Sequence, residues 1–284
     1  MNGLLVIDKP GGMTSRDVVN RVQRMFPKRT KIGHTGTLDP LATGVLVVCV
    51  GAATRLADFV QAMGKTYTSR VRLGATSDTD DADGTVTERS GCAIPTREQL
   101  EDVLSRFVGE IEQVPPAYSA LKVAGARAHD LARRGQSPEL AARRVSVYAV
   151  RLLAYEFPFA DVEIDCGKGT YIRSIARDVG EALGCGGIVQ TLRRTRVGPF
   201  RAEDGVGLDD PPKLLPMALA LGEMRRLTTN DEGARRFRQG QTVRLMDDAE
   251  VGTRVAVLDE RGELVGIGLV VAGGVRPEVV FNTV

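Results

Sequence analysis

The order of apolar and polar residues predicts strands and amphipathic helices over the first part of the chain. The opening run LLVIDKP is typical of a short buried strand, and Ser15 is placed to cap the helix that follows. Apolar residues within 18–26 fall on one helical face, and Pro27 ends that pattern. Residues 45–50, VLVVCV, are apolar on both faces and therefore predict a fully buried strand.

The spacing of apolar residues changes from helical to alternating after a second, shorter predicted helix. Apolar side chains in 56–63 recur at helical spacing, whereas residues 65–73 alternate as a half-buried strand does. Two further helices are expected at 96–108 and 172–183, and residues 161–166 alternate as a strand between them. The pattern predicts a chain that mixes α and β elements.

The C-terminal part has a different composition from the rest. Short β-type runs separated by turn residues replace the helical patterns and predict a small β-rich module. Residues 227–284 hold seven arginines, no lysine and nine acids, so they carry −2 while residues 1–226 carry +4. We expect a large domain over 1–226, a small module over 227–284, and phosphate attraction mainly in the first.

Composition argues against several classes of protein. Hydrophobic residues make up 43% of the chain and charged residues 26%, as in ordinary globular proteins. No apolar run reaches the length of a membrane span, and the N-terminus lacks the pattern of a signal peptide, so a cytoplasmic protein is expected. The four cysteines are widely spaced and only two histidines accompany them, which predicts buried thiols and no metal site.

Basic residues gather in two segments. Residues 122–151 hold seven lysines and arginines against two acids, and residues 190–202 hold four arginines and no acid. A local positive excess attracts polyanions, although arginines on a loop can also form a plain solvated surface. The two clusters together favour a nucleic-acid partner.

Two segments offer candidate chemistry. The acid-rich turn SDTDDADG does not match the spacing of a calcium-binding loop, so we interpret it as a solvated loop. Asp39 lies in GHTGTLDPLATG among apolar neighbours, and glycines at 33, 36 and 44 would allow close approach of a substrate. The alternative is that Asp39 only begins an Asp-Pro turn or caps the next element.

Five blocks, in matching order and spacing, resemble the TruB family, which makes pseudouridine 55 in tRNA. They are GLLVIDKPGGMTS, GHTGTLDPLATG, KTYTSRVRLGATSDTDDADG, QVPPAYSALK and CGKGTYIRSIARDVGEALGCGGIVQTLRRTRVGPF. The resemblance covers positions 3 to about 201, and GVRPEVVF is similar to the family's small PUA module.

The resemblance implies an α+β catalytic domain with a central mixed, mainly antiparallel sheet, followed by a PUA-like module. It also implies a monomer that acts on the T arm and T loop of tRNA without a cofactor, a membrane or an obligate protein partner.

The resemblance assigns roles to individual residues. Asp39 is the expected catalytic aspartate, acting either by attack on carbon or by taking a ribose proton. Arg173 is its expected ion partner, which would hold the pKa of the carboxyl group down. Tyr67 is expected to stack beneath the flipped uracil and to help remove the C5 proton. The further expected substrate contacts are His34, Leu192, Lys65 and Tyr171.

An insertion at about 115–144 resembles the family's tRNA-clasping segment. The expected RNA contacts are Arg127, Arg133, Arg134, Arg143, Arg144, Arg193 and Arg194. Arg16 and His129 depart from the histidine and tyrosine usual in the family at those places. A guide-RNA-dependent relative and a non-catalytic RNA-binding protein remain as alternatives.

Overall fold

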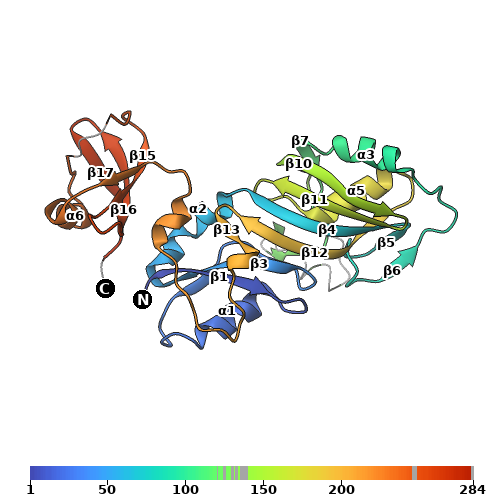
Figure 1. Cartoon of the computed structure of the whole chain (residues 1–284), viewed down its shortest axis with the longest axis horizontal. Helices are drawn as coiled ribbons and strands as arrows, with labels where there is room; N and C mark the ends of the chain where they lie inside the picture. The colour runs from blue at the N-terminus through green and yellow to red at the C-terminus, as the bar shows by residue number, and fades with distance from the viewer. Residues whose placement is uncertain are drawn as a thin grey trace.

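The computed structural model describes residues 1–282 except 120, 124–125, 129–130, 132–133, 135–139 and 245–247. Its larger part is built on one nine-stranded sheet (Figure 1). The strands are β1 (Gly3–Lys9), β2 (Ile32–His34), β3 (Thr43–Val50), β4 (Lys65–Leu73), β7 (Gly109–Gln113), β10 (Arg143–Glu156), β11 (Phe159–Cys166), β12 (Gly187–Val197) and β13 (Phe200–Arg201).

The main path through this sheet is β1-β3-β12-β4-β11-β10-β7, with β2 beside β3 and β13 beside β12. Among the described strands of this sheet, β12 and β3 are the one parallel pair, through two residue pairs, and the other neighbouring pairs are antiparallel. The expected mixed, mainly antiparallel sheet is confirmed.

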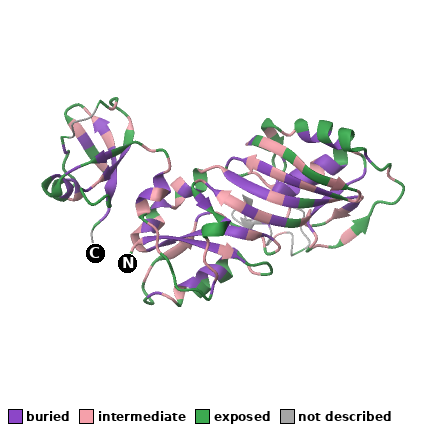
Figure 2. Cartoon of the chain, viewed as in Figure 1, coloured by how far each residue is buried: buried purple, intermediate pink, exposed green. Residues whose placement is uncertain are grey.

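Two helices cover one face of the sheet (Figure 1). The apolar sides of α3 (Arg97–Ser105) and α5 (Ile172–Ala182) pack on β4 and β11 in one continuous core. Buried and more exposed positions alternate along β4 and β11 (Figure 2). The other face therefore carries polar side chains such as Arg70 and Asp161, which bind each other. The remaining helices of the larger part are α1 (Ser15–Gln23), η1 (Gly51–Leu56), α2 (Ala57–Ala62), η2 (Ala202–Asp204) and η3 (Met217–Leu221).

The cap of α1 lies one residue earlier than expected. Thr14 is the N-cap: its side chain accepts from the Asp17 backbone N–H, and the Asp17 carboxylate accepts from the Thr14 backbone N–H. The prediction of a cap at Ser15 was wrong because the Ser15 hydroxyl is used elsewhere. It bonds the main chain of Leu38.

The arginine-rich segment 193–201 was considered as a loop, but most of it is strand. Residues 193–197 end β12, which lies between β3 and β4 near the middle of the sheet. Pairing of β12 with β4 is interrupted by two register shifts, and β10 also shifts twice against β11. Such irregularities break the two-residue alternation by which a strand is recognised in a sequence.

A second sheet follows near the C-terminus, which confirms the expected small β-rich module. Its strands, in spatial order, are β14 (Arg226–Thr228), β15 (Arg254–Leu258), β16 (Leu264–Val271) and β17 (Gly274–Val280), with α6 (Asp231–Arg238) against them. The two-stranded pairs β5 (Ala75–Ser77) with β6 (Val86–Glu88), and β8 (Lys122–Val123) with β9 (Ala126–Arg127), complete the elements. The domain division after residue 226 stays a prediction.

The module also packs on the larger part. Phe281 is 2% exposed and shares a core cluster with Leu56 and Val60. The Arg55 guanidinium lies 5.4 Å from the centre of the Phe281 ring and donates to the Val280 carbonyl at 2.6 Å. Among the described residues, no helix has both the length and the apolar character needed to cross a membrane.

Candidate active site

Asp39 lies in the loop of residues 35–42 between β2 and β3, which we call the Asp39 loop. The Ser15 hydroxyl binds both main-chain groups of Leu38, accepting from N–H at 2.8 Å and donating to C=O at 3.1 Å. From β12, the Arg194 guanidinium donates to the carbonyl of Gly36 at 3.0 Å. A main-chain bond from the Ala42 N–H to the Asp39 carbonyl adds a turn, so the turn anticipated for Asp39 is also present.

Lys9 holds the same loop from β1. Its side chain is fully buried, and Nζ donates to the carbonyls of Pro10, Met13 and Pro40 at 2.9, 2.7 and 3.3 Å. Burial lowers its pKa to about 8, and the negative charge of Asp39 opposes that shift. Lys9 was not among the expected site residues, although a lysine at the end of an apolar strand is a usable signal.

Arg173 is the direct ion partner of Asp39. Its Nε lies 2.9 Å from Asp39 Oδ2, and its second carboxylate neighbour, Asp81, lies 3.4 Å from Nη1. Nη1 also donates to the Thr79 carbonyl and Nη2 to the Tyr118 carbonyl. The Arg173 side chain is 4% exposed whereas that of Asp39 is 31% exposed, so the carboxylate remains accessible and the guanidinium lies behind it.

The pKa of Asp39 shifts in the direction opposite to the one expected. Burial raises the pKa of its carboxyl group above the ordinary value, the positive charge of Arg173 opposes that rise, and the negative charge of Asp81 adds to it. Arg173 acts on this pKa in the expected, downward direction, but the loss of hydration around the carboxylate is the larger effect, so the net shift is upward.

The acid-rich turn is part of the site rather than a solvated loop. Asp81 is 4% exposed, and Asp80 forms an ion pair of 2.9 Å with Arg177 of α5. The main chain of the turn pairs with β12, because Ala82 N–H donates to Val189 C=O and Val189 N–H donates to Asp80 C=O. Our interpretation of the turn as solvated was wrong for Asp80 and Asp81, whose carboxylates face arginines of α5 more than 90 residues away in the chain. Asp78 and Asp83 are exposed.

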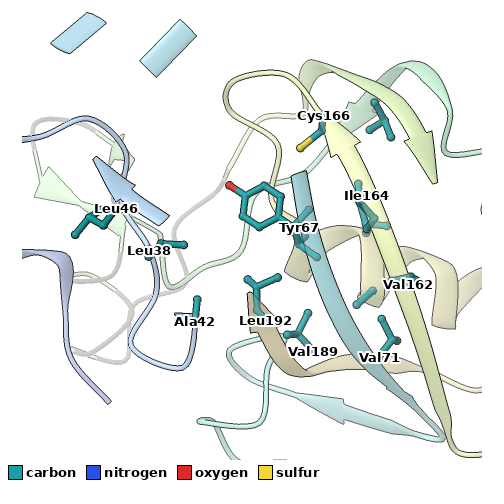
Figure 3. Close-up of a cluster of buried hydrophobic side chains, with 14 of the residues drawn as sticks. Leu38, Ala42, Leu46, Tyr67, Val71, Val162, Ile164, Cys166, Val189 and Leu192 are labelled. Carbon is teal, nitrogen blue, oxygen red and sulfur yellow. The ribbon is translucent and has the colours of Figure 1, made fainter. Parts of the chain in front are cut away.

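Tyr67 projects from β4 toward the Asp39 loop. Figure 3 shows its ring between Leu38 on one side and Ile164 and Cys166 on the other, with Leu192 close by. The Arg194 guanidinium carbon lies 6.0 Å from the ring centre. Burial raises the pKa of the Tyr67 hydroxyl above 10, so the phenol is protonated at neutral pH.

The other expected substrate contacts, His34, Tyr171 and Lys65, lie at three different elements. His34, at the end of β2, has a pKa lowered by burial and by the charges of Arg16 and Arg194, so its ring is neutral at pH 7. Its buried Nδ1 has no hydrogen-bond partner among the described residues. Tyr171 immediately precedes α5, where Gln113 binds both its main-chain groups. Lys65 is 7% exposed, and its Nζ donates to the carbonyls of Gln61 and Met63.

The expected RNA-contacting arginines fall into four groups, of which the buried Arg194 is one. Arg134, Arg143 and Arg144 are exposed. Arg193 forms a two-point ion pair with Asp8, at 2.9 Å for each contact. The Arg127 side chain, Arg133 and His129 lie outside the described residues.

The side chain of Arg194 is buried and binds main-chain groups of the protein. It is 2% exposed, and its guanidinium donates to the carbonyls of Val45, Gly36 and Thr37. A phosphate contact by Arg194 has no support in this arrangement. Its position instead suits holding the Asp39 loop against β12.

Gly44 serves a packing purpose that the sequence did not reveal. Its φ is +96°, and a Cβ added there would lie 2.2 Å from the Arg194 carbonyl oxygen. The close approach at this glycine is therefore that of β12, not of a substrate. At Gly36 the Arg194 side chain would lie 3.7 Å from an added Cβ, and at Gly33 nothing lies within 4 Å.

Sequence comparison identifies relatives that span nearly the whole chain. Residues 23–172 match the TruB family pseudouridylate synthase N-terminal domain. Residues 173–214 match the tRNA pseudouridylate synthase B C-terminal domain, and residues 226–281 match the pseudouridine synthase II TruB C-terminal region. The tRNA pseudouridine synthase B of Cereibacter sphaeroides is 45% identical over 99% of this chain and 97% of that protein. The protein of the same name from Xanthomonas campestris pv. campestris is 42% identical, over 99% and 94%.

Solved structures share the fold. A chain in the crystal structure of a Cbf5-Nop10-Gar1 complex superposes with a TM-score of 0.73 and 26% identity, over 99% of this chain and 85% of that one. A chain in the structure of an H/ACA RNP bound to a substrate RNA containing 2′-deoxyuridine has a TM-score of 0.74 and 24% identity, also over 99% and 85%. These similarities extend through the second sheet as well as the first.

Proposed function

The chain belongs to the TruB family of pseudouridylate synthases, and we propose that it isomerises uridine 55 in the T loop of tRNA to pseudouridine. Relatives that are 40–45% identical over 99% of the chain carry the name tRNA pseudouridine synthase B. One observation carries the proposal: an accessible carboxylate, Asp39, is paired at 2.9 Å with a buried guanidinium, Arg173. A site that acts on a neutral base and its sugar can use such a fixed negative charge.

The reaction needs no external group to balance. The C1′–N1 bond breaks, the uracil turns, a C5–C1′ bond forms, and the proton lost from C5 is matched by one gained at N1. We propose that the Asp39 carboxylate starts this sequence, by attack on C1′ or by accepting a ribose proton. Arg173 favours the ionised carboxylate and fixes its orientation.

We propose that Tyr67 and Leu192 form the apolar contacts of the extruded uracil. Tyr67 presents a ring beside the Asp39 loop, and its raised pKa favours a stacking role over proton abstraction. The neutral ring of His34 is suited to stacking on bases next to the vacated position. Because the Nζ of Lys65 is bonded to main-chain carbonyls, its contribution would be to support the start of β4.

We further propose that the insertion clasps the T arm through exposed cations. Arg134, Arg143 and Arg144 have the exposure that phosphate contacts require. The proposed enzyme works as a monomer in the cytoplasm, with a catalytic domain over 1–226 and a PUA-like RNA-binding module over 227–284.

A guide-RNA-dependent enzyme is the main rival. The superposed chains from Cbf5 and H/ACA structures are 24–26% identical, whereas the relatives named for tRNA reach 45%. The higher identity over nearly the whole chain favours the stand-alone reaction. Purified protein given unmodified tRNA transcript tests this directly. A stand-alone enzyme releases tritium from 5-tritiated uridine without a guide RNA, whereas a guide-RNA-dependent enzyme does not.

The catalytic assignment is tested with Asp39→Asn. We expect turnover to fall at least ~10³-fold while tRNA affinity stays within about threefold, because the change removes the reacting charge and keeps the shape. Tritium release and filter binding measure the two quantities, and mapping of the modified uridine identifies position 55. Equal losses of binding and turnover, or modification at another position, would contradict the proposal.

A further inference from the structure

A basic cleft lies apart from the Asp39 site. It has a volume of about 400 Å³ and is formed by Met1, by residues 27 and 29–31, and by residues 51–52 and 54–55 of η1. Its cations are Arg29, Lys31 and Arg55, and no acid is among its lining residues. We call it the η1 cleft.

The positive charge of the η1 cleft is not neutralised by neighbours. Arg29 and Lys31 are exposed, and neither has an ion pair among the described residues. The preceding segment adds to the excess, because residues 24–31 contain four cations and no acid. Uncompensated cations around one concave surface are the arrangement that binds phosphate groups.

The frame of the η1 cleft is held by the fold. The Gly51 N–H donates to the Lys31 carbonyl at 2.7 Å, and the Ala52 N–H donates to the Asn2 side chain at 2.8 Å. Arg55 is oriented by the Val280 carbonyl and the Phe281 ring. Arg55 is therefore preorganised and loses less conformational entropy on binding than a freely mobile side chain does.

The η1 cleft is connected to the reaction site by a short strand. Lys31 directly precedes β2, which pairs with β3 and ends at His34, where the Asp39 loop starts. At about 3.3 Å per residue, Lys31 and His34 are separated by roughly 10 Å. An RNA seated over the Asp39 loop therefore has other phosphates within reach of these cations.

We propose that the η1 cleft binds backbone phosphates of the substrate RNA outside the nucleotide that reacts. The inference rests on the proposed function for the identity of the RNA. The contacts add affinity in both the ground state and the transition state, so they act on binding and not on turnover at saturation. Arg29 and Lys31 supply the charge, and Arg55 adds a fixed guanidinium at the boundary with the C-terminal module.

The test compares two double variants of the full chain. Arg29→Gln/Lys31→Gln removes two cations from the η1 cleft. Arg89→Gln/Arg97→Gln removes two exposed cations from the β6–α3 region and serves as the control. Thermal unfolding midpoints equal to that of the wild-type protein establish that both variants fold, which is expected because all four side chains are exposed.

Affinity for unmodified tRNA transcript is measured by filter binding over a range of salt concentrations. For the cleft variant we expect affinity to fall on the order of tenfold, and the slope of log K against log salt to decrease by about 0.7–0.9 per lost contact. The turnover number at saturating RNA is expected to stay within about twofold of wild type. Affinity and slope equal to those of the control variant would overturn the inference, as would a loss confined to turnover.

Two further arms separate the possible causes. If the wild-type protein binds RNA through the cleft but modifies no tRNA, the proposed function fails and the cleft assignment stands. If inorganic phosphate or a poly-glutamate peptide distinguishes wild type from the cleft variant while RNA affinity does not, the cleft serves a different anion and the inference is overturned.

Discussion

At Asp39, two opposing effects act on one carboxyl group. Removing water from the carboxylate disfavours its charge, and the guanidinium of Arg173 at 2.9 Å restores part of the loss. The pKa of Asp39 is raised above 3.8 in the folded protein. Over a range of pH above 3.8, the native state therefore keeps a proton that the unfolded chain has already lost. The stability contributed by this group falls as pH rises through that window, so the ionised form is maintained for chemistry at a cost in stability.

The raised pKa of Asp39 should be visible in the pH dependence of the reaction. The acidic limb of the pH–rate profile should have an apparent pKa above 3.8, and Arg173→Gln should move it to still higher pH, because the charge that favours ionised Asp39 is lost. We also expect Arg173→Gln to lower turnover by roughly 10²- to 10³-fold through misplacement of the carboxylate. Single-turnover rates across pH measure both effects. Arg70→Gln, which breaks a two-point ion pair with Asp161 instead, should leave the limb in place.

The charge of Asp39 should also affect the stability of the folded protein. Since ionised Asp39 is disfavoured by burial, Asp39→Asn should not lower the free energy of unfolding at neutral pH, and it should raise it if the Asn amide finds a partner. Urea denaturation at pH 7 and near pH 4 measures the change. A variant clearly less stable than wild type at pH 7 would mean that the Arg173 attraction outweighs desolvation.

At the scale of elements, the Asp39 loop is held by three neighbours that come from different parts of the chain. β1 supplies Lys9, α1 supplies Ser15, and β12 supplies Arg194. Each binds main-chain groups of the loop, so the contacts fix the path of the backbone rather than the reacting atoms. Such support preorganises the Asp39 side chain before substrate arrives.

A substitution at Gly44 tests how closely β3 and β12 must approach each other. Gly44→Ala places a Cβ 2.2 Å from the Arg194 carbonyl oxygen at a positive φ, so we expect a loss of about 3 kcal/mol or more in the free energy of unfolding. Gly12→Ala is the control, because Gly12 also has a positive φ but open space around it, and it should cost only about 1–2 kcal/mol. Urea denaturation compares them, and equal losses would show that backbone strain alone limits both positions.

At the scale of the whole molecule, two sheets are joined by apolar packing. Residues of the second sheet, including Ala256 and Ile267, share a core cluster with Val45 and Leu56 of the larger part. Another cluster, around Phe237, lies within the C-terminal module. The module therefore has a core of its own and a fixed contact surface, at which Val280 and Phe281 orient Arg55 of the η1 cleft.

Phe281 is the side chain that most directly tests this junction. Phe281→Ala should reduce stability by about 3–5 kcal/mol, because it opens a cavity between the two parts and removes the ring beneath Arg55. Phe159→Ala, at a 38% exposed ring, should cost no more than about 1 kcal/mol. Chemical denaturation gives the two values, and limited proteolysis of residues 205–225 should become faster only in the Phe281 variant.

The sequence alone determined features that depend on near neighbours in the chain. The helical periods at 97–105 and 172–182 and the alternation at 65–73 predicted the corresponding elements, because amphipathicity repeats within a few residues. The resemblance of five sequence blocks pointed to Asp39 and Arg173, and the structure brings the two within 2.9 Å. The tRNA position and the residue roles stay predictions.

Tertiary structure decided the features that depend on residues far apart. β12 lies between β3 and β4, and this placement buries Arg194 against the Asp39 loop. In the sequence, Arg194 and this loop are about 150 residues apart. Asp81 is buried because α5 brings Arg173 to it, and the pKa of Asp39 rises because several segments together exclude water. Burial and electric field are sums over all neighbours in space, so a local pattern cannot contain them.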